Sequence, residues 1–219
     1  MKQALLIIDV QNDYFEGGKS ELYNPVEALN NIEKILRHFR GINLPVIHVQ
    51  HINIREGASF FLPNTDGACI HKNLMPQEGE YLVIKNMPNS FFDTNLLDII
   101  KDNAITNLII CGMMSHMCVD TTTRACKDYG ISVTLIDDAC ATKNLIWNGK
   151  IISAETVHDV FMASLNGMFA TVMKTGDFFC TRILGGVSKS MIAPKTHAIV
   201  PLYVRSLSAI NCRPQSLHR

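Results

Sequence analysis

Three residues capable of acid–base and nucleophilic chemistry stand at the ends of predicted strands. Asp9 closes the apolar run ALLIID, Lys85 closes YLVIK, and Cys118 follows NLIICG after one short turn. In open parallel sheets the carboxyl ends of the strands lie at one edge, where ligands bind. The sequence therefore predicts that a carboxylate, an ammonium group and a thiol face the same edge of a sheet.

Cys118 has the sequence position of a nucleophile. Gly112 and Ser115 favour a turn followed by a helix start, and one helical face then continues through Val119, Thr122, Cys126 and Tyr129. The free N–H groups and positive dipole at a helix N-terminus favour thiolate over thiol and can stabilise an oxyanion. A buried structural cysteine is the other interpretation, because free cysteines are among the most buried residues.

Asp9 and Lys85 also have ordinary interpretations. A carboxylate at the end of an apolar strand needs a cation or hydrogen-bond donors, and such groups serve either as acid or base or as turn acceptors. A lysine at a strand end is commonly solvated. All three residues occur at comparable strand ends, and this favours the functional interpretation of each.

The remaining sequence predicts the elements that position these residues. Short apolar runs, the last of them FATVM, alternate with helical patterns at residues 25–40, 93–103, 115–129 and 153–166. The first helix has Pro25 suited to its first turn and Gly41 suited to its end. Such alternation predicts an α/β fold with a parallel sheet covered by helices on both faces.

Composition indicates a folded protein with a small, neutral partner. The 219 residues are 47% hydrophobic and 18% charged, with 20 Lys and Arg against 20 Asp and Glu. This balance gives no attraction for nucleic acid or anionic lipid, and no run reaches the roughly 20 apolar residues of a membrane span. We expect a cytoplasmic protein with a small-molecule substrate and with no nucleic-acid or membrane partner.

Two segments depart from the α/β pattern. Residues 53–80 lack a sustained period and are predicted to form a long surface loop, the kind that often serves as a functional lid. Residues 181–219 carry six Lys and Arg, no acid and several prolines. We expect a domain over 1–180 and a basic extension over 181–219 that is disordered or forms an arm between subunits. The seven cysteines include no CxxC pair, which favours reduced thiols, mostly in the core.

Three motifs carry a resemblance to a known family. They are LLIIDVQNDYF at 5–15, VIKNMPNSFFDTNL at 83–96 and IICGMMSHMCVDTTTRACKDYG at 109–130. In these residues the chain resembles, over about 1–178, the cysteine hydrolase group of the isochorismatase-like superfamily. The resemblance implies a three-layer α-β-α fold with a six-stranded, mostly parallel, Rossmann-like sheet. It also implies a homodimer or homotetramer and no cofactor.

The resemblance also implies residue roles. Asp9 would be the general base, Lys85 the charge-stabilising partner and Cys118 the nucleophile of a catalytic triad. A cis peptide between Met113 and Met114 would place the backbone N–H groups of Met114 and Cys118 as an oxyanion hole. Two further residues are assigned to the substrate pocket: Phe15, from the first motif, and His116, for which a subunit contact is the alternative.

The sequence departs from the metal-binding members of this superfamily. Nicotinamidases carry an Asp-x-His pair and a further histidine for a metal beside the substrate, whereas the aligned stretch here, VIHVQHINIREG, has Gln50 near the acidic position. We therefore assign no metal and interpret His48, His51 and His71 as strand and loop residues. Metal binding by these histidines is the alternative.

The leading hypothesis is hydrolysis of an amide or other C–N bond of a small molecule through a covalent acyl-enzyme on Cys118. True isochorismatases, which cleave a vinyl ether, lack a cysteine at this position, so its presence favours acyl chemistry. The alternatives are isochorismatase-type vinyl-ether hydrolysis and a non-catalytic binding or thiol-sensing module.

Overall fold

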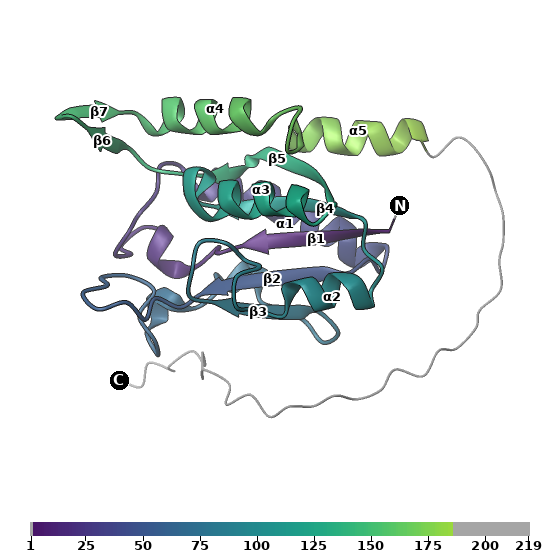
Figure 1. Ribbon diagram of the computed structural model, residues 1–219, viewed down its shortest axis with the longest axis horizontal. Coiled ribbons are helices and arrows are strands. Elements are labelled where there is room, and N and C mark those ends of the chain that lie inside the picture. Colours follow the sequence, from purple (N-terminus) through teal and green to yellow (C-terminus); the bar gives the residue numbers. More distant parts are fainter. Residues whose placement is uncertain (1, 186–219) are drawn as a thin grey trace, which may run out of the picture.

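Six parallel strands form the centre of the molecule in the computed structural model, which describes residues 2–185 (Figure 1). Their order across the sheet is β3 (Tyr81–Lys85), β2 (Val46–His51), β1 (Gln3–Ile8), β4 (Asn107–Met113), β5 (Ser132–Ala141) and β8 (Thr171–Met173). Every neighbouring pair is parallel. The predicted six-stranded, mostly parallel sheet is confirmed.

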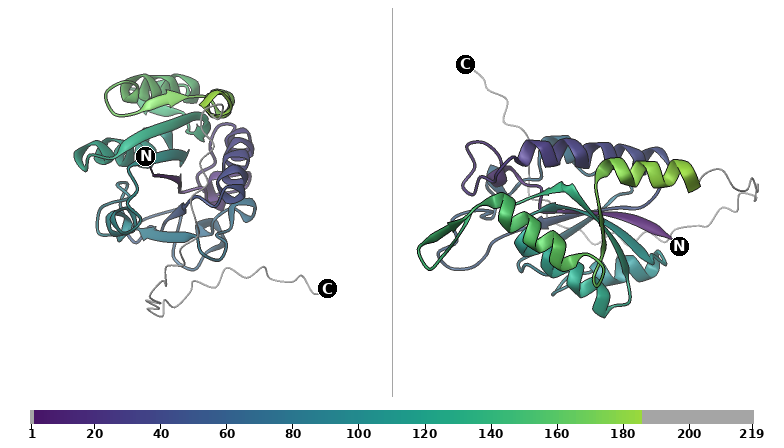
Figure 2. Two further views of the ribbon diagram at one scale, coloured as in Figure 1. Left: turned by 90° about the vertical axis from the view of Figure 1, so that its right-hand side faces the viewer. Right: turned by 90° about the horizontal axis from the view of Figure 1, so that it is seen from above.

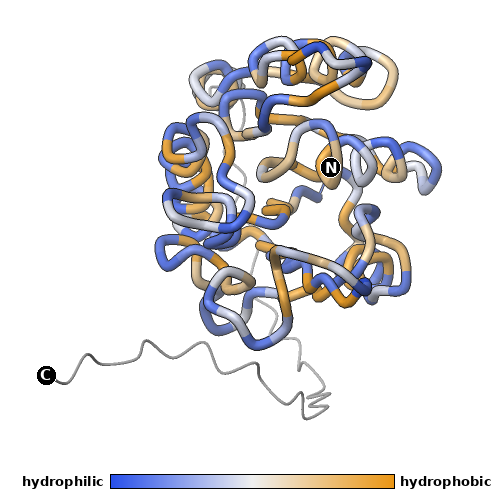
Figure 3. The backbone as a smooth tube through the Cα atoms, turned by 90° about the vertical axis from the view of Figure 1, so that its left-hand side faces the viewer, coloured by the Kyte–Doolittle hydropathy of each residue, from blue (hydrophilic) through white to orange (hydrophobic). Residues whose placement is uncertain are grey.

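Helices cover both faces of this sheet (Figure 2). On one face lie α1 (Pro25–Gly41) and α5 (Thr175–Gly185), and on the other lie α2 (Leu96–Asp102), α3 (Asp120–Asp128) and α4 (Ala154–Leu165). Alternate side chains of β1 point to opposite faces of the sheet. Leu5 and Ile7 pack with α1, while Leu6 and Ile8 pack with α2 to α4. Figure 3 shows hydrophobic and hydrophilic stretches alternating along the covering helices. The three-layer prediction is therefore confirmed as well.

Local sequence explains where several helices begin. Pro25 is the first residue of α1, where its missing N–H costs nothing, and the helix runs one residue past the predicted end. The Ser153 side chain caps α4 by accepting a hydrogen bond from the Thr156 N–H at 3.2 Å. Within the described residues, no helix combines the length and the apolar character needed to cross a membrane.

Three features were not predicted from the sequence. A hairpin of β6 (Leu145–Trp147) and β7 (Lys150–Ile152) projects from the body (Figure 1), and each of its strands is too short to leave a pattern. The long loop over 53–80 contains two short 3₁₀ turns, Asp66–Ala68 and Lys72–Leu74. Finally, α5 continues across the expected boundary at residue 180. The rest of the predicted extension, 186–219, lies outside the described residues.

Gly112 of β4 allows the backbone to pass directly against β1. Its φ is +129°, and a Cβ built there would lie 2.1 Å from the Ile8 carbonyl oxygen. We expect Gly112→Ala to lower the free energy of unfolding by about 2 to 6 kcal/mol, because backbone strain and overpacking add. Because Ile8 immediately precedes Asp9, activity should fall with it. Denaturant titration measures the first effect.

Gly130 provides the matched control for this substitution. Its φ of +70° is also left-handed, but a Cβ there would meet nothing within 4 Å. Gly130→Ala should therefore cost only the backbone strain, about 1 to 2 kcal/mol. Equal losses in the two variants would contradict the close approach of β4 to β1.

Candidate active site

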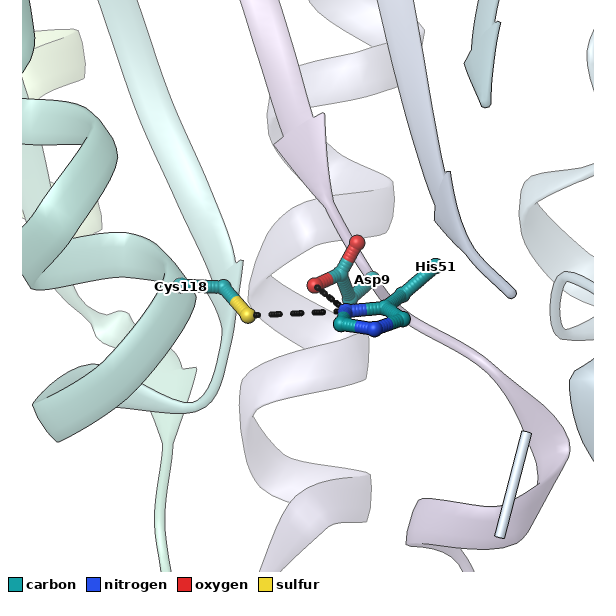
Figure 4. Close-up of side chains that lie close together, drawn as sticks. All are labelled: Asp9, His51 and Cys118. Carbon is teal, nitrogen blue, oxygen red and sulfur yellow. Dashed lines mark hydrogen bonds and ion pairs between the residues drawn. The ribbon is translucent and has the colours of Figure 1, made fainter. Parts of the chain in front are cut away.

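The predicted catalytic residues converge at the carboxyl edge of the sheet. Asp9 directly follows β1 and Lys85 is the last residue of β3, while Cys118 lies in a single π-helical turn, Ser115–Val119, between β4 and α3. Figure 4 shows the Asp9 carboxylate and the Cys118 thiol facing the same space from opposite sides. All three side chains are buried, with at most 3% of their surface exposed.

Lys85 reaches this position from two strands away. Its strand, β3, is separated from β1 by β2, a distance of about 10 Å at the usual strand spacing. The long lysine stem spans that gap and brings Nζ to 2.8 Å from Asp9 Oδ2. Nζ also donates to Cys118 Sγ at 3.1 Å and to the Met87 carbonyl at 3.1 Å. A shorter cation on β3 could not reach both groups.

The Asp9 carboxylate retains accepting capacity. Its contact with Lys85 is an ion pair, and neither carboxylate oxygen has a well-directed hydrogen-bond partner among the described residues. One of these oxygens and Cys118 Sγ lie within 4.8 Å of each other. Asp9 can therefore take a proton from the thiol after a small movement.

Burial and the neighbouring Asp9 charge favour the protonated form of the Cys118 thiol. Burial raises the pKa of Cys118, the Asp9 charge raises it further, and Lys85 acts in the opposite direction. Although burial alone would lower the pKa of Lys85, the Asp9 and Cys118 charges raise it. The sequence predicted that a helix N-terminus favours thiolate, whereas burial and the Asp9 charge act in the opposite direction. A thiol whose pKa is raised in this way needs a base to become a nucleophile.

His51 belongs to the site, although it was interpreted from sequence as an ordinary strand residue. Its Nδ1 lies 3.1 Å from Lys85 Nζ, 3.9 Å from Asp9 Oδ2 and 4.0 Å from Cys118 Sγ. Burial and the Lys85 charge lower the pKa of His51 to about 4, so the imidazole is neutral at pH 7. Because Lys85 donates to Nδ1, the ring proton lies on Nε2.

Gln11 holds His51 in place through the backbone. Its amide nitrogen donates to the His51 carbonyl at 2.9 Å, and its amide oxygen accepts from the His51 N–H at 2.8 Å. The Gln11 side chain thus pairs with both backbone groups of His51, as a neighbouring β-strand would. The sequence signal that could have identified His51 is its place as the last residue of β2, at the same sheet edge as Asp9.

The side chains of Asp9, His51 and Cys118 form a group whose atoms could ligate a metal ion. However, the Lys85 ammonium lies 2.8, 3.1 and 3.1 Å from the atoms of these three residues and takes the place a cation would occupy. A metal would have to displace it, so this donor set does not fit a metal while Lys85 is charged. The other two histidines lie elsewhere. His48 Nε2 contacts Glu80 Oε2 at 2.9 Å, and the tilted rings of His71 and Phe15 have centroids 4.5 Å apart.

A cavity of about 140 Å³ opens over the Cys118 thiol. Its walls combine Tyr14, Phe60, Met114 and Met117 with polar residues, including Arg55. Loop 53–80 contributes three of the lining residues, Asn53, Arg55 and Phe60.

The two pocket residues expected from sequence do not line this cavity. From the first motif, it is Tyr14 that lines it, whereas Phe15 points into the core cluster and packs on His71. His116 Nδ1 contacts Thr142 Oγ1 at 2.5 Å, and its ring lies beside Phe161. Adjacent residues of a 3₁₀ or π-helical turn point in different directions, and the sequence pattern did not specify which one enters the site.

The turn before Cys118 has the expected backbone. The Met113–Met114 peptide is cis, and Met114 lines the cavity. The Met114 carbonyl accepts from the N–H groups of Met117 and Val119, which closes the π-helical turn around the thiol. These bonds fix Cys118 between the end of β4 and the start of α3.

Comparison with known proteins extends over nearly all the described residues. The isochorismatase domain model matches residues 3–177. The uncharacterized isochorismatase family protein YddQ of Bacillus subtilis is 49% identical over 178 residues, covering 81% of this chain and 99% of that protein. Streptothricin hydrolase of Streptomyces noursei is 33% identical over 143 residues, covering 65% and 56%. The crystal structure of an isochorismatase from Pseudomonas putida has a TM-score of 0.76 at 36% identity, covering 80% and 89%.

Proposed function

This chain belongs to the isochorismatase family and is a hydrolase of C–N or related bonds, and from that premise we propose that it hydrolyses a small-molecule amide through an acyl-enzyme on Cys118. One observation carries the proposal. A buried ammonium group, Lys85 Nζ, contacts both the Asp9 carboxylate and the Cys118 thiol beneath a small cavity. A nucleophile, a base and a fixed positive charge at one point suit acyl transfer.

In the proposed reaction, Asp9 accepts the thiol proton as Cys118 Sγ attacks the substrate carbonyl carbon. The backbone N–H groups of Met114 and Cys118 donate to the resulting oxyanion. Asp9 then gives the proton to the leaving nitrogen, the C–N bond breaks, and a thioester remains on Cys118. Water, deprotonated by Asp9, hydrolyses the thioester to the acid, and the proton returns to the thiol.

Lys85 balances charge throughout this cycle. While Asp9 is ionised, the ammonium pairs with it, and when Asp9 holds the proton, the ammonium pairs with the thiolate. The distances of 2.8 and 3.1 Å support both pairings without movement of Nζ. Neutral His51 accepts a further N–H of Lys85 and helps to aim it.

The proposal includes an assembly of two or four copies and a cytoplasmic location. Support for self-association comes from the β6–β7 hairpin, where Ile146, Trp147 and Ile151 are each at least 70% exposed. Projecting apolar side chains of this kind mark contact surfaces.

The test is a panel of small amides and ureides, assayed for amine or ammonia release and quenched for mass spectrometry. We expect turnover of at least one compound, with an acyl mass increment on the peptide carrying Cys118. The peptide carrying Cys126, a buried cysteine of α3, is the internal control and should remain unmodified.

Two results would replace the proposal with an alternative. Pyruvate release from isochorismate, with no turnover of the panel, would indicate vinyl-ether hydrolysis. No turnover of any compound, together with selective oxidation of Cys118 by peroxide, would indicate a thiol sensor.

A further inference from the structure

Arg55 lines the cavity with a guanidinium group that no carboxylate neutralises among the described side chains. By contrast, Arg40 pairs with Glu80 at 2.7 Å and Arg124 with Asp120 at 2.9 Å. The Arg55 guanidinium has one long hydrogen bond, 3.5 Å from Nε to Asn53 Oδ1. Arg55 is also solvent-exposed, so its donors are available to a ligand that enters the cavity.

The charges around the cavity leave Arg55 uncompensated. Lys85 is balanced by Asp9, and Cys118 and Tyr14 are both protonated because burial raises their pKa values. His51 is neutral because its pKa is about 4. The other walls are amide, thioether, proline and aromatic groups. Arg55 is therefore the single charged side chain among the described lining residues at neutral pH, and the cavity is electropositive.

We propose that the substrate carries a carboxylate that Arg55 binds, so that the protein acts on a small amide or ureide of an organic acid. This inference rests on the proposed function and specifies its substrate class. A guanidinium presents a planar fork of donors that matches a carboxylate, and such charge-assisted pairs are stronger than hydrogen bonds between neutral groups. The cavity of about 140 Å³ is small, which suits a substrate of this size.

Alkylation of Cys118 by two matched reagents tests the anion site without a known substrate. Iodoacetate carries a carboxylate, and iodoacetamide is its neutral analogue of nearly the same shape. We expect Arg55→Gln to lower the ratio of the iodoacetate rate to the iodoacetamide rate at Cys118 by about tenfold or more, since a hydrogen bond to a charged group is lost. The two rates are measured by mass spectrometry of the Cys118 peptide.

Two further variants sharpen the comparison. Arg37→Gln removes the same charge from an exposed position on α1, away from the cavity, and should leave the ratio unchanged. Arg55→Lys keeps the charge without the planar fork and should give an intermediate ratio. An unchanged ratio in Arg55→Gln would overturn the proposal, and so would an equal slowing of both reagents, which would indicate a positioning effect.

Paired substrates separate this proposal from the hydrolase proposal itself. Succinamic acid and its neutral analogue butyramide form one such pair, and hydantoic acid and its methyl ester form another. We expect higher kcat/KM for the acid of each pair, lost in Arg55→Gln mainly through KM. Equal hydrolysis of acid and neutral forms would refute the anion site and keep the hydrolase. A high iodoacetate ratio without hydrolysis of any compound would keep the anion site and contradict the proposed hydrolysis of amides through Cys118.

Discussion

Replacing Cys118 with alanine is expected to abolish turnover while leaving the fold intact. The loss should be on the order of 10⁶-fold in kcat, as when the nucleophile of another acyl-transfer triad is removed. The side chain is 97% buried in a tight turn, but thiol to methyl is a small change in volume, so thermal stability should change little. Steady-state kinetics on the best amide of the panel, beside a thermal melt, measures both quantities.

Cys126→Ala is the matched control for this variant. Cys126 is a fully buried cysteine of α3, two turns beyond Cys118, and contacts neither Asp9 nor Lys85 through any hydrogen bond or ion pair of the described residues. Its replacement is the same small change in volume, so it should change thermal stability as little and leave kcat near the wild-type value. Substantial activity in Cys118→Ala would end the acyl-enzyme proposal, and an equal loss in the Cys126 variant would show that packing explains the result.

Asp9→Asn should change turnover and thiol reactivity in opposite directions. Asp9 has a φ of 52°, which asparagine tolerates, so the backbone need not move. Turnover should fall by roughly 10² to 10⁴-fold, because the amide cannot accept the thiol proton. The pKa of Cys118 should fall, because a charge that raises it is gone while Lys85, which lowers it, remains. The pH at which iodoacetamide alkylation reaches half its maximal rate should therefore move down.

Lys85→Met provides the contrasting arm of this experiment. It removes the charge that lowers the pKa of the Cys118 thiol, so half-maximal alkylation should move to higher pH, and turnover should fall as well. It also leaves the Asp9 carboxylate buried without its cation, which should lower the free energy of unfolding by about 3 to 5 kcal/mol. If Asp9→Asn moved the alkylation profile upward, Asp9 would be required to form the thiolate even in the resting enzyme.

Local sequence was sufficient to predict the parallel sheet and the functional residues at three of its strand ends. Strands and helices have different hydrophobic periods, and parallel strands place their carboxyl ends at one edge. Asp9, Lys85 and Cys118 could therefore be assigned to a common site from the sequence alone. The cis peptide between Met113 and Met114 agreed with the motif that predicted it. The short β6–β7 hairpin left too few residues to form a pattern.

Only the tertiary structure decided which other side chains enter the site. His51 lies near the thiol because it ends β2, the strand next to β1, at the edge of the sheet that carries Asp9. Arg55 lines the cavity because loop 53–80 folds over the strand ends. Tyr14, rather than Phe15, lines the cavity because of the direction of one short turn. The protonated resting thiol likewise depends on burial beside Asp9, a contact across 109 residues of sequence. Sequence periodicity reports on neighbours along the chain, whereas burial, charge pairing and side-chain direction depend on groups brought together from distant segments.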